Sequence, residues 1–273
     1  MVLCTYKLGG VLMATMLFYN FKGGVGKTSL STITAFQLVR KNKKVLFVDL
    51  DAQANATDIL SKTYEEPKPE RSLYDSLMKG DLKPSICSLH SHLDLLPSDW
   101  SMSLWNQSVE KLDVRSRNLI LKTLLEPIKN NYDYIILDVS PTLSTLVNNA
   151  VLASDAVTIV LQTQQSAFTG ALKTASYLQD LRNDYNANFK LTGIILYLMK
   201  KSGSVDNSIA DTAKKEFSDG IYANEIYSRE RVKKWANNGI TAKPTDPHDN
   251  ATHEMYNLVI KEHLYRMKEM GIN

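Results

Sequence analysis

The stretch FYNFKGGVGKTSL, residues 18–30, decides the fold. It nearly matches the phosphate-loop pattern G-x-x-x-x-G-K-S/T, but Phe21 stands where the first glycine belongs, and Lys22 adds a second lysine ahead of Lys27. An apolar run at 16–20 precedes the glycines, and a helical period follows them. In that context backbone N–H groups and a helix N-terminus point at anionic oxygens. We therefore expect this loop to bind phosphate.

Consecutive residues of this loop are the predicted nucleotide contacts. The ammonium group of Lys27 would neutralise the β and γ phosphates, and the hydroxyl of Thr28 would ligate Mg²⁺. The glycines let the phosphates approach the backbone closely. The predicted nucleotide-binding residues are Lys22, Gly23, Gly24, Val25, Gly26, Lys27, Thr28 and Ser29.

Phosphate chemistry also needs carboxylates near the metal and near the attacking water. Two apolar runs end in such residues: VLFVDLDAQAN, 45–55, carries Asp49 and Asp51, and YDYIILDVSP, 132–141, carries Asp138. In an extended chain, a spacing of two residues directs the side chains of Asp49 and Asp51 to one side. Ligands bind at the carboxyl ends of strands in open α/β sheets. The sequence therefore predicts that these acids lie beside the phosphate loop.

Apolar runs of strand length alternate with helical periods along the chain. Strands are expected at 16–20, 45–49, 93–97, 134–138, 156–161 and 191–197. Most are continuous Val/Ile/Leu runs, as in parallel sheets that are covered on both faces. Between them, apolar residues recur every three or four positions around 30–39 and 168–178. This alternation predicts an α/β fold: a single doubly wound, mostly parallel sheet with helices on both faces.

The composition is that of an ordinary globular protein. The 273 residues are 44% hydrophobic and 22% charged, and a net charge of +3 does not indicate a polyanion partner without a local basic patch. Two cysteines, Cys4 and Cys87, cannot build a disulfide framework, which fits a reducing compartment. We expect residues 1–15 to be a short tail, neither signal peptide nor membrane span, and 16–273 to form one P-loop ATPase domain.

Three segments together resemble the deviant Walker A ATPases, and within them the ParA/Soj partitioning proteins: KGGVGKT, VDLDAQAN and ILDVSP. The resemblance runs from about Met16 to about Ile240. It implies that ATP and Mg²⁺ are the ligands, and that two identical subunits hold two ATP molecules between them. It also implies a role for Lys22, which would reach the triphosphate of the partner subunit as an arginine finger does.

The resemblance also assigns roles to the carboxylates. Asp51 matches the acid that orients the attacking water, whereas Asp49 and Asp138 match acids that hold Mg²⁺ or its waters. The predicted catalytic residues are Lys22, Lys27 and Asp51. The predicted metal ligands are Thr28, Asp49 and Asp138.

Two expected switch segments depart from the family pattern. The family usually has D-P-Q-G-N where this chain has DAQAN, 51–55, and D-x-P-P where it has DVSP, 138–141. It usually has a proline where Gln162 ends its strand. Fewer prolines leave these segments looser, which bears on the rate and trigger of hydrolysis and not on nucleotide binding.

Basic residues cluster in the C-terminal third of the chain. The densest cluster is SRERVKKW, 228–235, in which Arg231 aligns with an arginine of the family segment I-P-R-N-V-R. The resemblance implies DNA binding here without sequence preference and only as the ATP dimer, because pairing joins two weak patches. Trp235 is expected to be packed and not to stack on a base. The predicted DNA-binding residues are Arg229, Arg231, Lys233 and Lys234.

Segments rich in proline and charge, at 61–72 and 241–252, are expected to be surface loops. The histidines of HSH, 90–92, and PTDPHDNATHE, 244–254, are interpreted as loop residues, because no third convergent metal ligand is evident. An apolar face over 256–267 predicts a final helix that packs on the sheet.

The leading hypothesis is an ATPase for DNA segregation, with plasmid DNA as the favoured cargo. It would dimerise on ATP, coat nucleoid DNA in the cytoplasm, and be released when a ParB-like, DNA-bound partner stimulates hydrolysis. Two alternatives stay open. One is a membrane-cycling regulator like MinD, which the mixed charge of EHLYRMKEMGIN, 262–273, disfavours. The other is a metabolic enzyme of the dethiobiotin synthetase type, which Lys22 disfavours.

Overall fold

One sheet of eight strands organises the described part of this computed structural model, residues 13–200 and 203–272. The strand order is β3-β4-β2-β5-β1-β6-β7-β8, and every neighbouring pair is parallel except β3 and β4. The strands are β1 Ala14–Tyr19, β2 Val45–Asp49, β3 Cys87–His90, β4 Leu93–Leu96, β5 Tyr134–Asp138, β6 Ala156–Gln162, β7 Lys190–Met199 and β8 Ile226–Tyr227. The predicted α/β fold with one mostly parallel sheet is confirmed.

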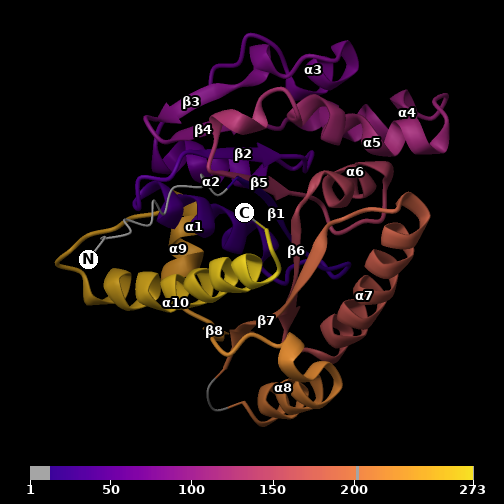
Figure 1. Cartoon of the computed structure of the whole chain (residues 1–273). Coiled ribbons are helices and arrows are strands. Elements are labelled where there is room, and N and C mark those ends of the chain that lie inside the picture. Colours follow the sequence, from indigo (N-terminus) through magenta and orange to yellow (C-terminus); the bar gives the residue numbers. More distant parts are fainter. Residues whose placement is uncertain (1–12, 201–202, 273) are drawn as a thin grey trace, which may run out of the picture.

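Helices cover the sheet on both faces (Figure 1). One layer is made of mutually contacting helices: α1 Lys27–Val39, α2 Asn55–Thr63, α9 Glu230–Asn238 and α10 Pro247–Glu269. The opposite layer consists of α5 Val114–Leu125, α6 Thr145–Ala153, α7 Gln165–Tyr185 and α8 Ser204–Phe217. Two short helices, α3 Leu73–Lys79 and α4 Trp105–Ser108, lie near α5 and α6. None of the helices within residues 13–200 and 203–272 is long and apolar enough to cross a bilayer.

The central strands are buried along their whole length, which explains their unbroken apolar sequences. Every residue of β1, β2 and β5 is buried. The six predicted strands are all present, with ends that differ by two residues or fewer. Since β1 begins at Ala14, the sheet begins inside the predicted tail 1–15, of which residues 1–12 lie outside the described residues.

Two edge strands were not predicted. In β3, buried and exposed residues alternate over only four positions, and β8 has two residues. Segments this short carry too little periodicity to be recognised from sequence. The β3 strand pairs antiparallel with β4, as an edge strand of a parallel sheet often does.

Parts of both predicted surface loops are helical. Helix α2 continues to Thr63, and α10 begins at Pro247, where the Asp246 side chain caps the main-chain N–H groups of His248 and Asp249. The interpretation of the histidines as loop residues is wrong for His90, which ends β3, and for His248 and His253, which lie in α10. Of these, His253 is buried. Its ring stacks between Trp235 and Phe36, with centroids 4.5 and 5.5 Å away.

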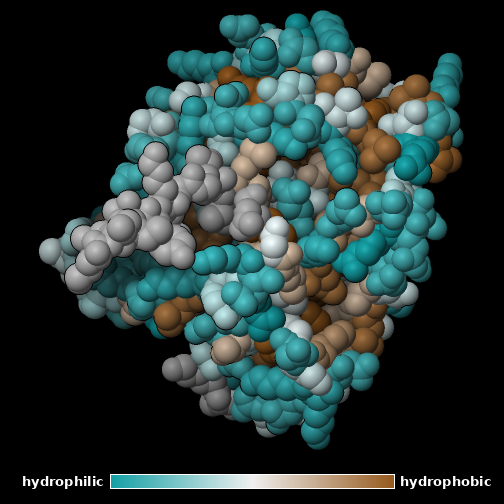
Figure 2. Space-filling view, in the orientation of Figure 1, coloured by the Kyte–Doolittle hydropathy of each residue, from teal (hydrophilic) through white to brown (hydrophobic). Residues whose placement is uncertain are grey.

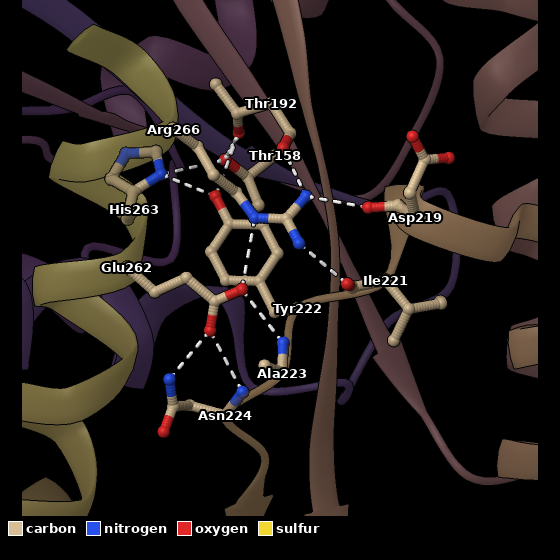
Figure 3. A network of polar contacts seen from close by, with 10 residues as sticks. All are labelled: Thr158, Thr192, Asp219, Ile221, Tyr222, Ala223, Asn224, Glu262, His263 and Arg266. Atoms are coloured by element: carbon tan, nitrogen blue, oxygen red, sulfur yellow. Dashed lines mark hydrogen bonds and ion pairs between the residues drawn. The ribbon is translucent and has the colours of Figure 1, made fainter. Parts of the chain in front are cut away.

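A network of polar side chains and main-chain groups connects α10 to the sheet and to the segment 219–224 (Figure 3). Nδ1 of His263 lies 2.8 Å from the Tyr222 hydroxyl, and Nε of Arg266 donates to Glu262 over 3.0 Å. The other guanidinium nitrogens of Arg266 donate to main-chain carbonyl groups at 192, 219 and 221. We call this group the α10 network. Its members are Thr158, Thr192, Asp219, Ile221, Tyr222, Ala223, Asn224, Glu262, His263 and Arg266.

Most of the face in Figure 2 is hydrophilic, and hydrophobic residues gather beside α4 and the start of α5. Several large apolar side chains in that part of the chain are exposed: Trp100, Leu104, Leu112 and Val114.

The predicted packing of Trp235 is confirmed, because only 2% of this residue is exposed.

Candidate functional site

The phosphate loop joins β1 to α1 at the carboxyl edge of the sheet. Its backbone needs glycine at two positions, since Gly24 and Gly26 have φ angles of +75° and +93°. The following residue, Lys27, is buried, and its Nζ donates to the main-chain carbonyl of Lys22 over 3.1 Å. Burial lowers the pKa of Lys27, while Asp138 and Asp51 act in the opposite direction. The loop is therefore preformed, with its ammonium group held over the place that a phosphate would take.

A cavity of about 600 Å³ opens beside this loop, a volume typical of small-ligand sites. The predicted loop residues that line it are Gly23, Gly24, Gly26, Lys27, Thr28 and Ser29. The other lining residues are Asp51, Asn55, Asp58, Ile59, Val139, Pro141, Tyr197, Leu198, Ser228, Arg229, Val232, Lys233, Ala236 and Asn237. Val25 is buried next to the loop and does not line the cavity.

Asp49 and Asp138 face each other across neighbouring strands. They are register partners at the ends of β2 and β5, and at most 1% of either residue is exposed. Burial raises the pKa of both carboxyl groups, and the proximity of the two adds to the rise at Asp138. The sequence prediction that these strand-end acids meet at the phosphate loop agrees with this geometry.

The two carboxylates differ in what they bind within the described residues. Asp49 accepts hydrogen bonds from the N–H and hydroxyl of Thr57, both over 2.8 Å. Asp138 accepts from the Ser31 hydroxyl over 3.3 Å through Oδ1, whereas its Oδ2 is buried and has no partner in residues 13–200 and 203–272. A buried, unpartnered carboxylate oxygen is costly unless a cation or donor binds it.

The oxygens of Asp138 and Thr28 suit Mg²⁺ that completes its shell with phosphate and water. They do not suit a metal whose ligands all come from protein side chains. The Thr28 side chain also interacts with Asp138, so a hydroxyl lies near this carboxylate. Within the described residues, no group of three or more His, Cys, Asp or Glu side chains could hold a metal. Protein-bound Mg²⁺ in phosphate sites usually takes one or two carboxylates and completes its shell with phosphate and water. The candidate ligands would be Thr28 and Asp138. Asp49 could serve as a further ligand only if its hydrogen bonds to Thr57 were released.

The segment after Asp49 turns sharply at the mouth of the cavity. Asp51 lines the cavity and accepts a hydrogen bond from the N–H of Gln53 over 3.0 Å. Ala54, which precedes α2, has φ +52° and ψ 31°, in the left-handed region that favours glycine. The backbone therefore adopts the shape that a glycine would give, at some cost in strain.

Lys22 is placed differently from Lys27. It is exposed and is not among the residues that line the cavity. Its main-chain N–H donates to Oδ1 of Asn20 over 2.9 Å, and Asn20 in turn donates to the carbonyl of Val160 over 2.9 Å. The two lysines of the loop thus have separate positions, one inside the cavity and one on the surface.

The four predicted DNA-binding residues on and beside α9 do not form one surface. Arg229 and Lys233 line the cavity. Arg231 makes ion pairs with Asp246 over 2.6 Å and Asp249 over 3.0 Å, so its charge is largely neutralised. Lys234 is exposed. The structure thus brings two of these residues toward the phosphate loop.

The far wall of the cavity contains residues that sequence reasoning missed. Tyr197 and Leu198 come from the end of β7, and Val232 and Asn237 come from α9. For Tyr197 a signal existed, because it ends the predicted strand 191–197 at the carboxyl edge where ligands bind. No comparable signal marked the residues of α9, since α9 reaches the cavity only through tertiary packing.

Comparisons with known proteins agree with this geometry. A family model described as an AAA domain matches residues 13–191. The sporulation initiation inhibitor protein Soj of Bacillus subtilis is 31% identical over 245 residues, 89% of this chain and 95% of Soj. The chromosome partitioning protein ParA of Caulobacter vibrioides is 28% identical over 218 residues, 78% of this chain and 80% of ParA. An ATP complex of Cyanothece McdA shares the fold, with a TM-score of 0.81, 20% identity, and coverage of 94% of this chain and 98% of McdA.

Proposed function

Because this chain belongs to the ParA/Soj family of deviant Walker A proteins, we propose that it is an ATPase that dimerises around bound ATP. Lys27 and the loop N–H groups bind the triphosphate, and Asp51 orients a water toward the γ-phosphorus. Attack by this water breaks the bond to the β–γ bridging oxygen and yields ADP and phosphate. Thr28 and Asp138, with Asp49 if it is released from Thr57, would hold Mg²⁺, which would neutralise phosphate charge.

The position of Lys22 carries the dimerisation proposal. An exposed lysine that belongs to the phosphate loop but does not line the cavity of its own chain is free to reach a second chain. When two loops face each other, each Lys22 would contact the phosphates bound by the other chain. The triphosphate then becomes part of the interface, and its hydrolysis weakens the dimer.

Light scattering with a non-hydrolysable ATP analogue and Mg²⁺ tests this role. Wild type should form dimers, whereas Lys22→Ala should bind the analogue with unchanged affinity and stay monomeric. Lys79→Ala, which removes an exposed lysine from α3, is the control and should dimerise normally. Dimers of Lys22→Ala at wild-type concentrations would exclude the role.

The ATP dimer also binds DNA without sequence preference, through the basic residues Arg229, Arg231, Lys233 and Lys234. Electrostatic attraction to phosphates provides the affinity, and the dimer doubles the number of basic groups. Lys234 contributes most, because it is exposed and does not line the cavity, whereas Lys233 pairs with Glu230 and Arg231 is held by Asp246 and Asp249.

Filter binding to a DNA duplex at several salt concentrations tests the DNA proposal. Lys234→Ala should weaken ATP-dependent binding and reduce the salt slope by about 1 for each DNA phosphate that the lysine no longer neutralises. Nucleotide affinity should not change. Lys79→Ala again serves as the control. Binding by wild type that is equal with ATP and with ADP would contradict the proposal.

The cellular role that follows is segregation of DNA, with plasmid DNA as the favoured cargo, on the nucleoid in the cytoplasm. A ParB-like, DNA-bound protein would stimulate hydrolysis and release the dimer. One domain would begin at Ala14, where β1 begins, two residues before the predicted boundary. Microscopy of a fluorescent fusion should show wild type on the nucleoid and Lys22→Ala dispersed; dispersed wild type would contradict this role.

A further inference from the structure

Tyr197, at the end of β7, packs directly against the phosphate loop. A Cβ atom placed on Gly26 would lie 2.0 Å from Cε1 of the Tyr197 ring, so the ring occupies the space beside this glycine. Gly26 is the loop residue with φ +93° that immediately precedes Lys27. None of the surface of Tyr197 is exposed. The ring therefore supports the loop from behind.

The hydroxyl of Tyr197 is held from two sides. Its oxygen lies 2.5 Å from the hydroxyl of Tyr256 on α10, and Tyr256 is also fully buried. The side chain of Ser29, on the first turn of α1, interacts with the same hydroxyl. A continuous polar connection thus runs from α10 through Tyr197 to a residue of the phosphate loop.

The backbone around Tyr197 departs from regular strand geometry to make this contact. Leu198 has φ +56°, and the pairing of β7 with β8 shifts register between Tyr197 and Met199. A non-glycine residue in this region is strained and persists only when its surroundings hold it. The strain lies at the cavity, since both Tyr197 and Leu198 line it.

We propose that Tyr197 is a positioning residue of the nucleotide site and that Tyr256 fixes Tyr197 in place, so that α10 sets the geometry of the phosphate loop. This inference rests on the proposed binding of nucleotide at the loop. The ring limits the movement of Gly26, and the Ser29 contact limits the first turn of α1. Main-chain N–H groups that are already aligned bind phosphate without reorganisation, which is the source of the expected gain in affinity.

Equilibrium binding of fluorescent ADP and ATP analogues to single hydroxyl deletions tests the proposal. Tyr197→Phe and Tyr256→Phe each remove one end of the hydrogen bond and keep the ring. Both variants should weaken binding roughly five- to tenfold, by the same factor for ADP and ATP. The double variant should be no weaker than Tyr197→Phe, because that change alone removes both the bond to Tyr256 and the contact with Ser29.

Tyr132→Phe is the matched control. Its hydroxyl donates to Asp94 over 2.8 Å, 4% of the residue is exposed, and it does not line the cavity. It should lose stability in urea like the other two variants, yet bind both nucleotides within twofold of wild type. Tyr197→Leu removes the ring and should weaken binding more than Tyr197→Phe.

Affinities of Tyr197→Phe and Tyr256→Phe within twofold of wild type would overturn the proposal and leave nucleotide binding intact. Equal weakening by Tyr132→Phe would also overturn it, since the effect would then follow stability. Absence of binding by wild type would instead remove the proposed function, and this inference with it.

Discussion

Two polar clusters lie against the same sheet, one at the phosphate loop and one in the α10 network, and they differ in how their charges are paired. At the phosphate loop, Lys27 lines a cavity, Asp49 and Asp138 are buried at the ends of neighbouring strands, and one oxygen of Asp138 has no hydrogen-bond partner in the described residues. In the α10 network, the Glu262 carboxylate accepts four hydrogen bonds, from the main-chain N–H groups of 223 and 224, the side-chain amide of Asn224 and Nε of Arg266. An unpartnered carboxylate oxygen near a cavity is typical of a ligand-binding cluster. A carboxylate that is fully hydrogen-bonded within the protein, as in the α10 network, is typical of a cluster that stabilises the fold.

The pKa values of the two clusters show the same difference. At the cavity, burial raises the pKa of Asp138, so charge there is costly until a cation arrives. In the α10 network, burial lowers the pKa of His263 to about 4, so the histidine is neutral and needs no counterion. Changes at the phosphate loop are therefore expected to alter nucleotide binding, and changes in the α10 network are expected to alter the free energy of unfolding.

The largest effect is expected at the cavity. Lys27→Ala removes the ammonium group above the phosphates and should weaken nucleotide binding about a thousandfold, since truncating one partner of a buried charge pair costs roughly 4 kcal/mol. Titration calorimetry measures it. Lys43→Ala, which breaks the exposed pair with Asp133, is the control and should bind normally. A nucleotide affinity of Lys27→Ala within tenfold of wild type would contradict the assignment of the phosphate-loop cluster to nucleotide binding.

A smaller effect, confined to stability, is expected in the α10 network. Because the pKa of folded His263 lies near 4, below its unfolded value of 6.5, the unfolded chain takes up the proton first as the pH falls. The contribution of His263 to the free energy of unfolding should therefore be full above pH 6.5 and decrease by up to about 3 kcal/mol toward pH 4, whereas Asp49 and Asp138, whose pKa values are raised, contribute in the opposite direction. Urea unfolding between pH 7.5 and about 4 measures the slope.

His263→Phe should flatten this pH dependence while nucleotide affinity at pH 7.5 stays unchanged. The slope should not vanish, because burial also lowers the pKa of His253. The exposed His248 provides the control, and His248→Gln should keep the wild-type slope. Identical slopes for His263→Phe and wild type would mean that the α10 network does not hold its histidine neutral.

The smallest effect is expected in the backbone beside the cavity. Ala54→Gly should raise the free energy of unfolding by about 1 kcal/mol, because the left-handed conformation is costly for alanine and not for glycine. Ala52→Gly, two residues earlier in a conformation without positive φ, should lower it by about 0.5 kcal/mol. Thermal unfolding compares the two. Destabilisation by both changes would show that strain is not stored at Ala54.

The sequence predicted one wall of the cavity and not the other, for a physical reason. Lys27 lies in a local motif, and Asp49 and Asp138 end apolar strands, so their positions follow from short-range rules. Val232 and Asn237 reach the cavity only because α9 packs against α2, and no periodicity encodes that contact. His253 was misread because its partners, Trp235 and Phe36, are distant in sequence.

The order of synthesis gives α10 one more consequence. All eight strands and the glycine-rich turn leave the ribosome before Pro247–Glu269, since the chain emerges from its N-terminus. Until then Tyr197 lacks Tyr256, and Tyr222 lacks His263. A nascent chain can thus form its sheet before Tyr256 supports the phosphate loop through Tyr197, so the loop would reach its final geometry only in a nearly complete copy.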